Sequence, residues 1–166
     1  MADDDITIRT ATPADLAIVL RHRRAMFEEM GYTDRAALDR MQQNSERFFA
    51  VGLEDGTYRG WFAETAEGRV IAGGGVGLVP WPPHPRDDAR PFRPMIFNVY
   101  TEPEYRRRGI ARRLMDVMIE WCSREGYHVV DLHSSDQGRP LYLSMGFTPT
   151  SELRLTLRKG VAELGG

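Results

Sequence analysis

The order of apolar and polar positions divides the chain into alternating strands and helices. Short segments that alternate, or that are rich in β-branched residues, predict strands, and longer segments with apolar side chains three and four positions apart predict helices. The elements expected before residue 80 are a strand over residues 6–10, a helix over 13–30, a helix that follows Thr33 and Asp34 and reaches Phe49, and two hairpin strands over 57–64 and 70–79.

The second half of the chain contains a strand, a helix and another strand in direct succession. Residues 95–101 and 128–133 have the composition of strands, and residues 109–124 between them carry an apolar helical face. A helix that connects two neighbouring strands makes those strands parallel, with a right-handed crossover. A short helix over 138–144 and a last strand over 152–157, in which apolar and polar residues alternate, complete a predicted mixed α/β fold.

The second hairpin strand contains four glycines within residues 73–77. A glycine-rich segment of this kind resembles a nucleotide-binding loop, but prolines rather than a helix follow it. We interpret these glycines as strand positions against which another backbone or side chain packs closely. Residues 80–94, which are rich in proline, are predicted to form a loop.

The composition indicates a globular protein and argues against some classes of binding partner. The chain has 166 residues, 42% of them hydrophobic and 28% charged, which suits one domain, expected over residues 6–158 with loose termini at 1–5 and 159–166. A net charge of −2 argues against nucleic acid or an anionic membrane as a partner. The single cysteine, Cys122, is expected in the core, and no metal site is assigned. An acidic start and the lack of a membrane-length apolar stretch predict a cytoplasmic location.

The turn over residues 106–111 joins strand 95–101 to the next helix and contains three consecutive arginines and a glycine. The first N–H groups of a helix have no intrahelical partner, and the helix dipole adds partial positive charge at the same end. The turn therefore predicts a phosphate or pyrophosphate ligand. The alternative is that the arginines only keep a surface loop soluble.

Two motifs at the spacing of a known family make this interpretation more specific. The first is the acetyl-CoA signature Arg/Gln-x-x-Gly-x-Gly/Ala, and the second is Tyr-x-x-x-Gly-Phe. The matching residues are Arg106, Gly109 and Ala111 in the first motif and Tyr142, Gly146 and Phe147 in the second. With the order of elements from residue 6 to about residue 158, these motifs make the chain resemble the GNAT superfamily of N-acetyltransferases. The resemblance implies the order strand-helix-helix-hairpin-strand-helix-strand-helix-strand, with a parallel strand pair splayed around the acetyl-CoA site.

The resemblance also implies an activity and a cofactor. The chain is expected to transfer an acetyl group from acetyl-CoA to a primary amine of a small molecule, peptide or protein, by direct attack on the thioester. Backbone amides of residues 106–111 are expected to hold the pyrophosphate, and a backbone N–H near Val99 to stabilise the oxyanion. The cofactor contacts implied by the resemblance, or reachable from the basic turn, are Val99, Tyr100, Thr101, Arg106, Arg107, Arg108, Gly109, Ile110, Ala111, Arg112, Ser135 and Tyr142.

Tyr142 matches the general-acid tyrosine of the family. A phenol has a reference pKa of about 10, so it is protonated at neutral pH and can donate to the leaving thiolate. The general base stays open: Glu102, just after the signature strand, is the first candidate, and Glu28, Glu29 and His133 are weaker ones.

Two positions depart from the family pattern. The binding site for the amine acceptor is the part of the active site that the sequence specifies least. Asn98 lies on the strand where many members carry a glutamate base, and Ser135 stands where many carry an asparagine seven residues before the tyrosine. The residues assigned to the amine acceptor are Phe27, Glu28 and Asn98. Met26, Phe27 and Met30 could line a ligand cavity, but core packing is the favoured role for all three.

A non-catalytic CoA-binding regulatory domain is the alternative function, because such a domain needs the 106–111 turn but not Tyr142. A homodimer is compatible with the resemblance, since dimers are frequent in the family. Nucleic-acid binding is disfavoured, because no aromatic platform accompanies the arginine cluster.

Overall fold

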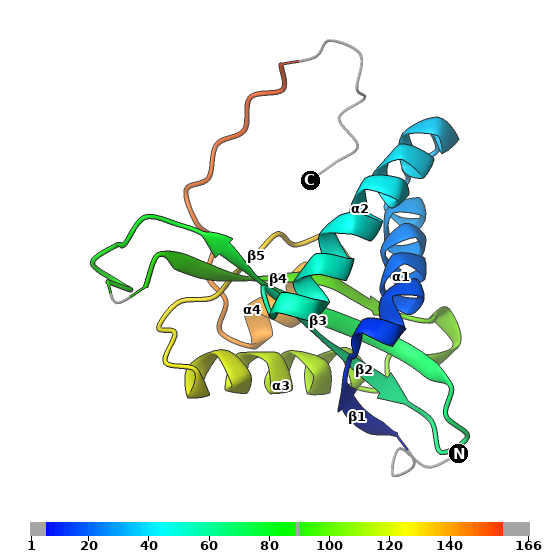
Figure 1. Ribbon diagram of the computed structural model, residues 1–166. Helices are drawn as coiled ribbons and strands as arrows, with labels where there is room; N and C mark the ends of the chain where they lie inside the picture. Colours follow the sequence, from blue (N-terminus) through cyan, green and yellow to red (C-terminus); the bar gives the residue numbers. More distant parts are fainter. Residues whose placement is uncertain (1–5, 89, 158–166) are drawn as a thin grey trace.

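A five-stranded sheet forms the centre of the structure, with α1 and α2 on one face and α3 on the other (Figure 1). The structure is a computed structural model that describes residues 6–88 and 90–157, so the predicted loose termini at 1–5 and 159–166 lie outside the described residues. The strands are β1 (Thr7–Thr10), β2 (Tyr58–Glu64), β3 (Val70–Pro80), β4 (Phe92–Thr101) and β5 (Asp131–Leu132). The helices are α1 (Leu16–Glu29), α2 (Arg35–Asp55), α3 (Ile110–Arg124) and α4 (Arg139–Ser144), with short 3-10 turns η2 (Pro13–Asp15) and η3 (Pro103–Tyr105).

The strands follow the order β1-β2-β3-β4-β5, and only the last pair is parallel. The predicted parallel pair on either side of α3 is therefore confirmed. The second member of the pair is much shorter than the predicted strand 128–133, because β5 pairs with β4 only at Met95–Asp131 and Ile96–Leu132. From Phe97 onward, β4 runs without a β5 partner, and the two strands enclose an opening instead of a ladder.

A β-bulge in β4 changes which side chains face each side of the sheet. Gly75 is opposite Phe97 and Gly73 is opposite Tyr100, so β4 carries one residue more than β3 across this interval. Asn98 takes up the extra residue in a left-handed backbone conformation, with φ of 57°. As a result, the successive side chains of Phe97 and Asn98 both lie toward α1 and α2.

Each face of the sheet has its own apolar core. Leu114, Met115 and Met118 of α3 are fully buried against one face. Val19 and Phe49, from α1 and α2, pack with Tyr58 and Phe62 against the other. The cysteine of α3 is buried in the first core, as predicted.

The glycines of β3 make room for aromatic rings. A Cβ atom on Gly77 would lie 2.7 Å from the Phe97 ring, and one on Gly75 would collide with the Tyr58 phenol. The interpretation of this segment as a closely packed strand is confirmed, and it is not a nucleotide loop.

The predicted last strand is wrong. Residues 151–157 form neither a helix nor a strand, and they leave the sheet as an extended segment (Figure 1). Leu153, Leu155 and Leu157 are 96%, 81% and 87% exposed. Alternation specifies a segment with two different faces, but a strand also needs a hydrogen-bonded neighbour, and β5 offers only two residues.

No helix within residues 6–88 and 90–157 is long and apolar enough to cross a membrane.

Candidate active site

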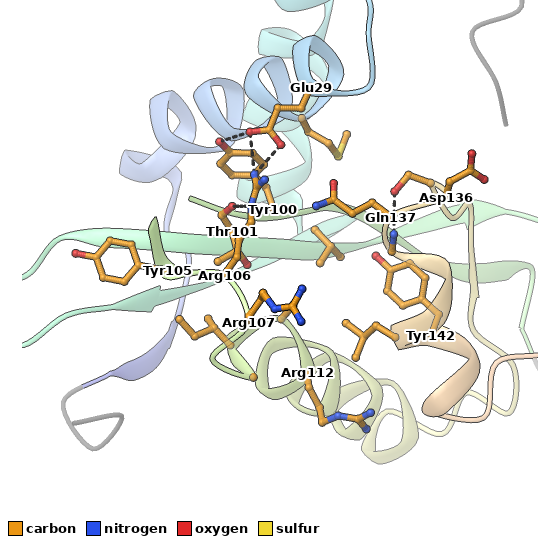
Figure 2. A pocket seen from close by; sticks show the side chains of 18 of the residues that line it. Glu29, Tyr100, Thr101, Tyr105, Arg106, Arg107, Arg112, Asp136, Gln137 and Tyr142 are labelled. Atoms are coloured by element: carbon orange, nitrogen blue, oxygen red, sulfur yellow. Dashed lines mark hydrogen bonds and ion pairs between the residues drawn. The ribbon is translucent and has the colours of Figure 1, made fainter. Parts of the chain in front are cut away.

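A cleft of about 630 Å³ opens where β4 and β5 part (Figure 2). One wall is the last turn of α1, and the floor is the end of β4. The turn that leads into α3 and the segment that leads into α4 close the other sides. The lining residues are Met26, Glu29, Met30, Val99, Tyr100, Thr101, Tyr105, Arg106, Arg107, Gly109, Ile110, Ala111, Arg112, Ser135, Asp136, Gln137, Gly138, Leu141 and Tyr142.

The turn before α3 presents backbone N–H groups to this cleft. Arg107 and Gly109 both have left-handed backbone conformations, with φ of 61° and 74°. The N–H of Arg113 donates to the carbonyl oxygen of Gly109 (3.1 Å), so the N–H groups from Gly109 to Arg112 precede the first intrahelical bond. Because the side chain of Ile110 is buried, the helix start is fixed in place while these N–H groups stay available for an anion.

The side chain of Arg106 is committed to the protein itself. Its Nε donates to the carbonyl oxygen of Thr101 (2.8 Å), and its Nη2 donates to both carboxylate oxygens of Glu29 (2.8 and 2.6 Å) (Figure 2). The hydroxyl of Tyr100 donates to the same carboxylate (3.2 Å). This cluster ties the turn to β4 and to the end of α1, so that Arg106 acts here as a structural link rather than as a free phosphate ligand.

The remaining arginines of the turn divide between the cleft and its surroundings. Arg107 lines the cleft. Arg108 does not line it, and its guanidinium lies 5.3 Å from the ring of Tyr105. Arg112 lines the cleft while its Nη2 donates to the Ser144 hydroxyl of α4 (2.5 Å). The structure therefore brings every expected cofactor residue except Arg108 to the cleft.

The edge of β4 fits an extended ligand chain. Val99, Tyr100 and Thr101 line the cleft beyond the point where pairing with β5 stops. Backbone groups on an unpaired strand edge are ready to bond with another extended chain. The open edge therefore suits the pantetheine arm, whose two amides resemble peptide groups.

Tyr142 lies across the cleft from Tyr100 (Figure 2). Burial raises the pKa of its phenol above the usual value of 10.0, so that Tyr142 is protonated at neutral pH. Its ring packs edge-on against Phe147 at 6.1 Å, and the hydroxyl of Ser135 accepts a hydrogen bond from the Gly138 N–H (3.2 Å) at the start of α4. The two motif residues Tyr142 and Phe147 thus hold each other, while Ser135 stabilises the turn that positions them.

The structure does not bring Glu102 into the cleft. Its carboxylate pairs with Arg69 (2.5 Å) and Arg21 (3.4 Å), and it lines a separate recess of about 260 Å³ beside His22. His133 is also elsewhere, since its Nε2 lies 2.9 Å from the exposed carboxylate of Glu152.

The three residues assigned to the acceptor do not line the cleft. Phe27 packs against Tyr32, Glu28 accepts a hydrogen bond from Arg24 (2.9 Å), and Asn98 is buried in the bulge. Glu29, a weaker candidate in the sequence, does line it.

Sequence reasoning missed part of the α1 wall. Met26 and Met30 line the cleft, so the favoured assignment of both to the core was wrong. Helical spacing identifies an apolar face but does not distinguish a face that packs on the core from one that borders a cleft. The useful signal was Glu29 between the two methionines, two residues before Gly31, which follows the helix.

Comparisons with known proteins agree with this geometry. The model of the acetyltransferase (GNAT) family matches residues 19–147. A GCN5-related N-acetyltransferase from Ralstonia eutropha has a similar structure, with a TM-score of 0.86 and 36% identity over 92% of this chain and 98% of that one. A predicted acetyltransferase from Clostridium acetobutylicum, solved with acetyl-CoA, has a TM-score of 0.82 and 27% identity over 92% of this chain and 96% of that one.

A curated human relative, N-acetyltransferase 8, is 33% identical over 97 residues, which cover 55% of this chain and 39% of that protein. The chain thus matches well under half the length of this relative. The family match covers both motifs and most of the described fold, and it confirms the predictions of an acyltransferase and of acetyl-CoA as its cofactor. The chain therefore belongs to the GNAT family of acetyltransferases.

Proposed function

We propose that the chain transfers an acetyl group from acetyl-CoA to a primary amine of a small molecule, peptide or protein. The observation that carries the proposal is the presence, in one cleft, of a helix start whose N–H groups from Gly109 to Arg112 have no intrahelical partner, an open edge of β4 and the protonated phenol of Tyr142. A regulatory CoA-binding domain would need the turn and the edge but not an acid facing them. A cytoplasmic location stays a prediction.

Each part of the cleft has a role in this transfer. When bound, acetyl-CoA supplies a thioester carbonyl carbon that the amine attacks and a thiolate that departs. The N–H groups from Gly109 to Arg112 bind phosphate, and the open β4 edge near Val99 orients the donor and provides N–H groups for a carbonyl oxygen that gains negative charge. Tyr142 donates a proton to the sulfur as the C–S bond breaks and the N–C bond forms.

The proton that the amine loses requires an acceptor, and we assign it to Glu29. Glu29 lines the cleft on the α1 wall, whereas Glu102 pairs with Arg69 and Arg21 outside it. Arg106 and Tyr100 hold the Glu29 carboxylate in position. A fixed carboxylate near the attacking amine attracts the ammonium form and takes up its proton directly or through one water.

Glu29→Gln is expected to lower kcat/KM for the amine at pH 7 by at least about 10-fold, since general base catalysis typically contributes 10²–10⁴-fold. The loss should shrink as the pH rises toward the pKa of the amine, because more of the amine is then already neutral. Glu28→Gln is the matched control, since Glu28 is adjacent on α1 and pairs with Arg24 outside the cleft. Equal losses in the two variants, or a loss that is constant with pH, would remove Glu29 from this role.

A thiol-release assay tests the activity itself. Acetyl-CoA is incubated with the protein and a panel of amines that includes amino acids, polyamines, aminoglycosides and peptides. Amine-dependent release of CoA, together with mass-spectrometric detection of the acetylated amine, is the expected result. Tight binding of acetyl-CoA without release for any amine would favour the regulatory domain.

We further propose that two copies of the chain associate through residues 151–157. Leu153, Leu155 and Leu157 alternate with polar residues and are at least 81% exposed, which leaves an apolar stripe along an extended segment, and β5 at the edge of the sheet is only two residues long. Light scattering should give the mass of a dimer for the wild type and of a monomer for Leu155→Asp, while Arg154→Asp stays dimeric. A monomeric wild type at high micromolar concentration would contradict the proposal.

A further inference from the structure

Arg23 of α1 has a guanidinium that is enclosed by uncharged partners. Its Nη1 donates to Oδ1 of Asn98 (2.8 Å), and its Nε donates to the hydroxyl of Ser45 (3.2 Å). The rings of Phe27 and Phe49 lie 4.9 and 5.4 Å from its central carbon. Both Asn98 and Ser45 are themselves buried, so these contacts lie between α1, α2 and β4 and not on the outer surface.

No carboxylate pairs with Arg23 among residues 6–88 and 90–157. Two other arginines of α1 differ in this respect, because Arg21 pairs with Glu102 and Arg24 pairs with Glu28 and Asp39. A charge removed from water is costly unless an opposite charge compensates it. Burial accordingly lowers the pKa of the Arg23 guanidinium.

The position of Arg23 connects it to the active-site cleft. Arg23, Met26 and Met30 lie at i, i+3 and i+7 on α1, which places them along one face of the helix. The two methionines line the cleft, whereas Arg23 does not line it itself and lies about one helical turn, or about 5 Å of helix rise, from Met26 toward the start of α1. On the strand side, its partner Asn98 immediately precedes the cleft residue Val99.

The bulge in β4 orients the guanidinium. Asn98 faces α1 only because of the extra residue in β4, and its Nδ2 is also within 3.4 Å of the Tyr58 hydroxyl. Asn98 and Ser45 together use one N–H of Nη1 and the N–H of Nε. Nη2 has no hydrogen-bond partner among the residues that the structure describes. A planar guanidinium with unused N–H groups is suited to bidentate binding of a carboxylate.

We propose that the amine acceptor carries its own carboxylate, as an amino acid does, and that Arg23 binds this carboxylate. The inference rests on the proposed acetyl transfer and specifies its acceptor. The amine would lie toward Glu29 and the thioester, and the carboxylate toward Arg23, so that the two charges of a zwitterion meet opposite charges along the α1 wall. A purely structural Arg23, held by its two aromatic rings, is the competing explanation.

Matched acceptors test the proposal in the wild-type protein without any substitution. Thiol release is measured with the common L-amino acids and with their carboxamides, which keep the amine and lose the carboxylate. The best amino acid should exceed its carboxamide in kcat/KM by on the order of 10- to 100-fold, mainly through a lower KM, because a charge-assisted bond is lost in the amide.

Arg23→Met should abolish this preference, since the methionine side chain fits between two rings but binds no carboxylate. Arg23→Lys should retain part of it. Arg24→Met is the matched control, because Arg24 is the next residue on the helix and its charge is already paired outside the cleft; its preference should equal that of the wild type.

The outcomes separate this inference from the proposed function. Release with no amine of the broad panel overturns the acetyl transfer itself. Release with amines but with equal kcat/KM for acid and carboxamide overturns only the role of the carboxylate. A preference that persists unchanged in Arg23→Met, even with a lowered melting temperature, makes Arg23 structural and also overturns the inference.

Discussion

Tyr142→Phe is expected to lower kcat by about 10²- to 10⁴-fold, the usual contribution of general acid catalysis. The phenylalanine ring keeps the edge-on contact with Phe147, so the affinity for acetyl-CoA should stay within about twofold of the wild type, because only the hydroxyl is removed. Rapid-mixing or steady-state thiol release gives kcat, and isothermal titration gives the affinity.

The control for this substitution is Tyr127→Phe. Tyr127 packs near Trp121 and Arg90, outside the cleft, and loss of its hydroxyl should leave kcat within about twofold of the wild type. Because burial raises the pKa of Tyr142 above 10.0, the phenol stays protonated through pH 9, and wild-type kcat should show no decline from its ionisation below that pH. An unchanged kcat in Tyr142→Phe would remove it as the acid.

Gly109→Val is expected to weaken acetyl-CoA binding by at least about 10-fold, because a β-branched residue with positive φ costs on the order of 1–2 kcal/mol. Gly109 has φ of 74°, and the new side chain would stand at the helix start, where the phosphate-binding N–H groups are. Arg107→Ala removes only one cleft-facing charge and should weaken binding by about threefold or less, since exposed charge interactions are screened by salt.

Gly56→Val is the control for Gly109→Val, because it introduces the same backbone strain at a position away from the acetyl-CoA site. Gly56 ends α2 with φ of 81°, and like Gly109 it has no atom within 4 Å of an added Cβ. The two valine variants should therefore lose similar stability, while only Gly109→Val loses acetyl-CoA affinity. A larger loss in Arg107→Ala than in Gly109→Val would make the turn an electrostatic patch instead of a backbone cradle.

The sequence predicted the part of the site that depends on short-range patterns. Residues 106–111 and Tyr142 each lie in a motif whose local backbone sets their geometry, and all of them except Arg108 reach the cleft. The start of α2 was predictable for the same reason, because the carboxylate of Asp34 accepts a hydrogen bond from the N–H of Ala37 (3.1 Å), whereas α2 continues past the expected Phe49 to Asp55.

The failures are at positions that depend on distant partners. Glu102 follows the signature strand as expected, but Arg69, 33 residues away in the chain, directs its carboxylate out of the cleft. The bulge at Asn98 turns a second successive side chain of β4 toward α1. The alternation of apolar and polar residues in β4 does not predict this bulge. Residues 152–157 have the pattern of a strand but no neighbour to pair with, so that local preference alone leaves them extended and exposed.

The open edge of β4 has a consequence for the folding equilibrium. From Val99 to Thr101 the strand lines the cleft without a β5 partner, and such an edge is where one chain can pair with another and aggregate. A ligand that binds only the folded chain stabilises it by RT ln(1 + [L]/Kd), which is about 2.7 kcal/mol at a concentration of 100 times Kd. The donor that occupies this edge would then serve as a removable sixth strand, and protein purified without it should unfold at a lower temperature and aggregate sooner.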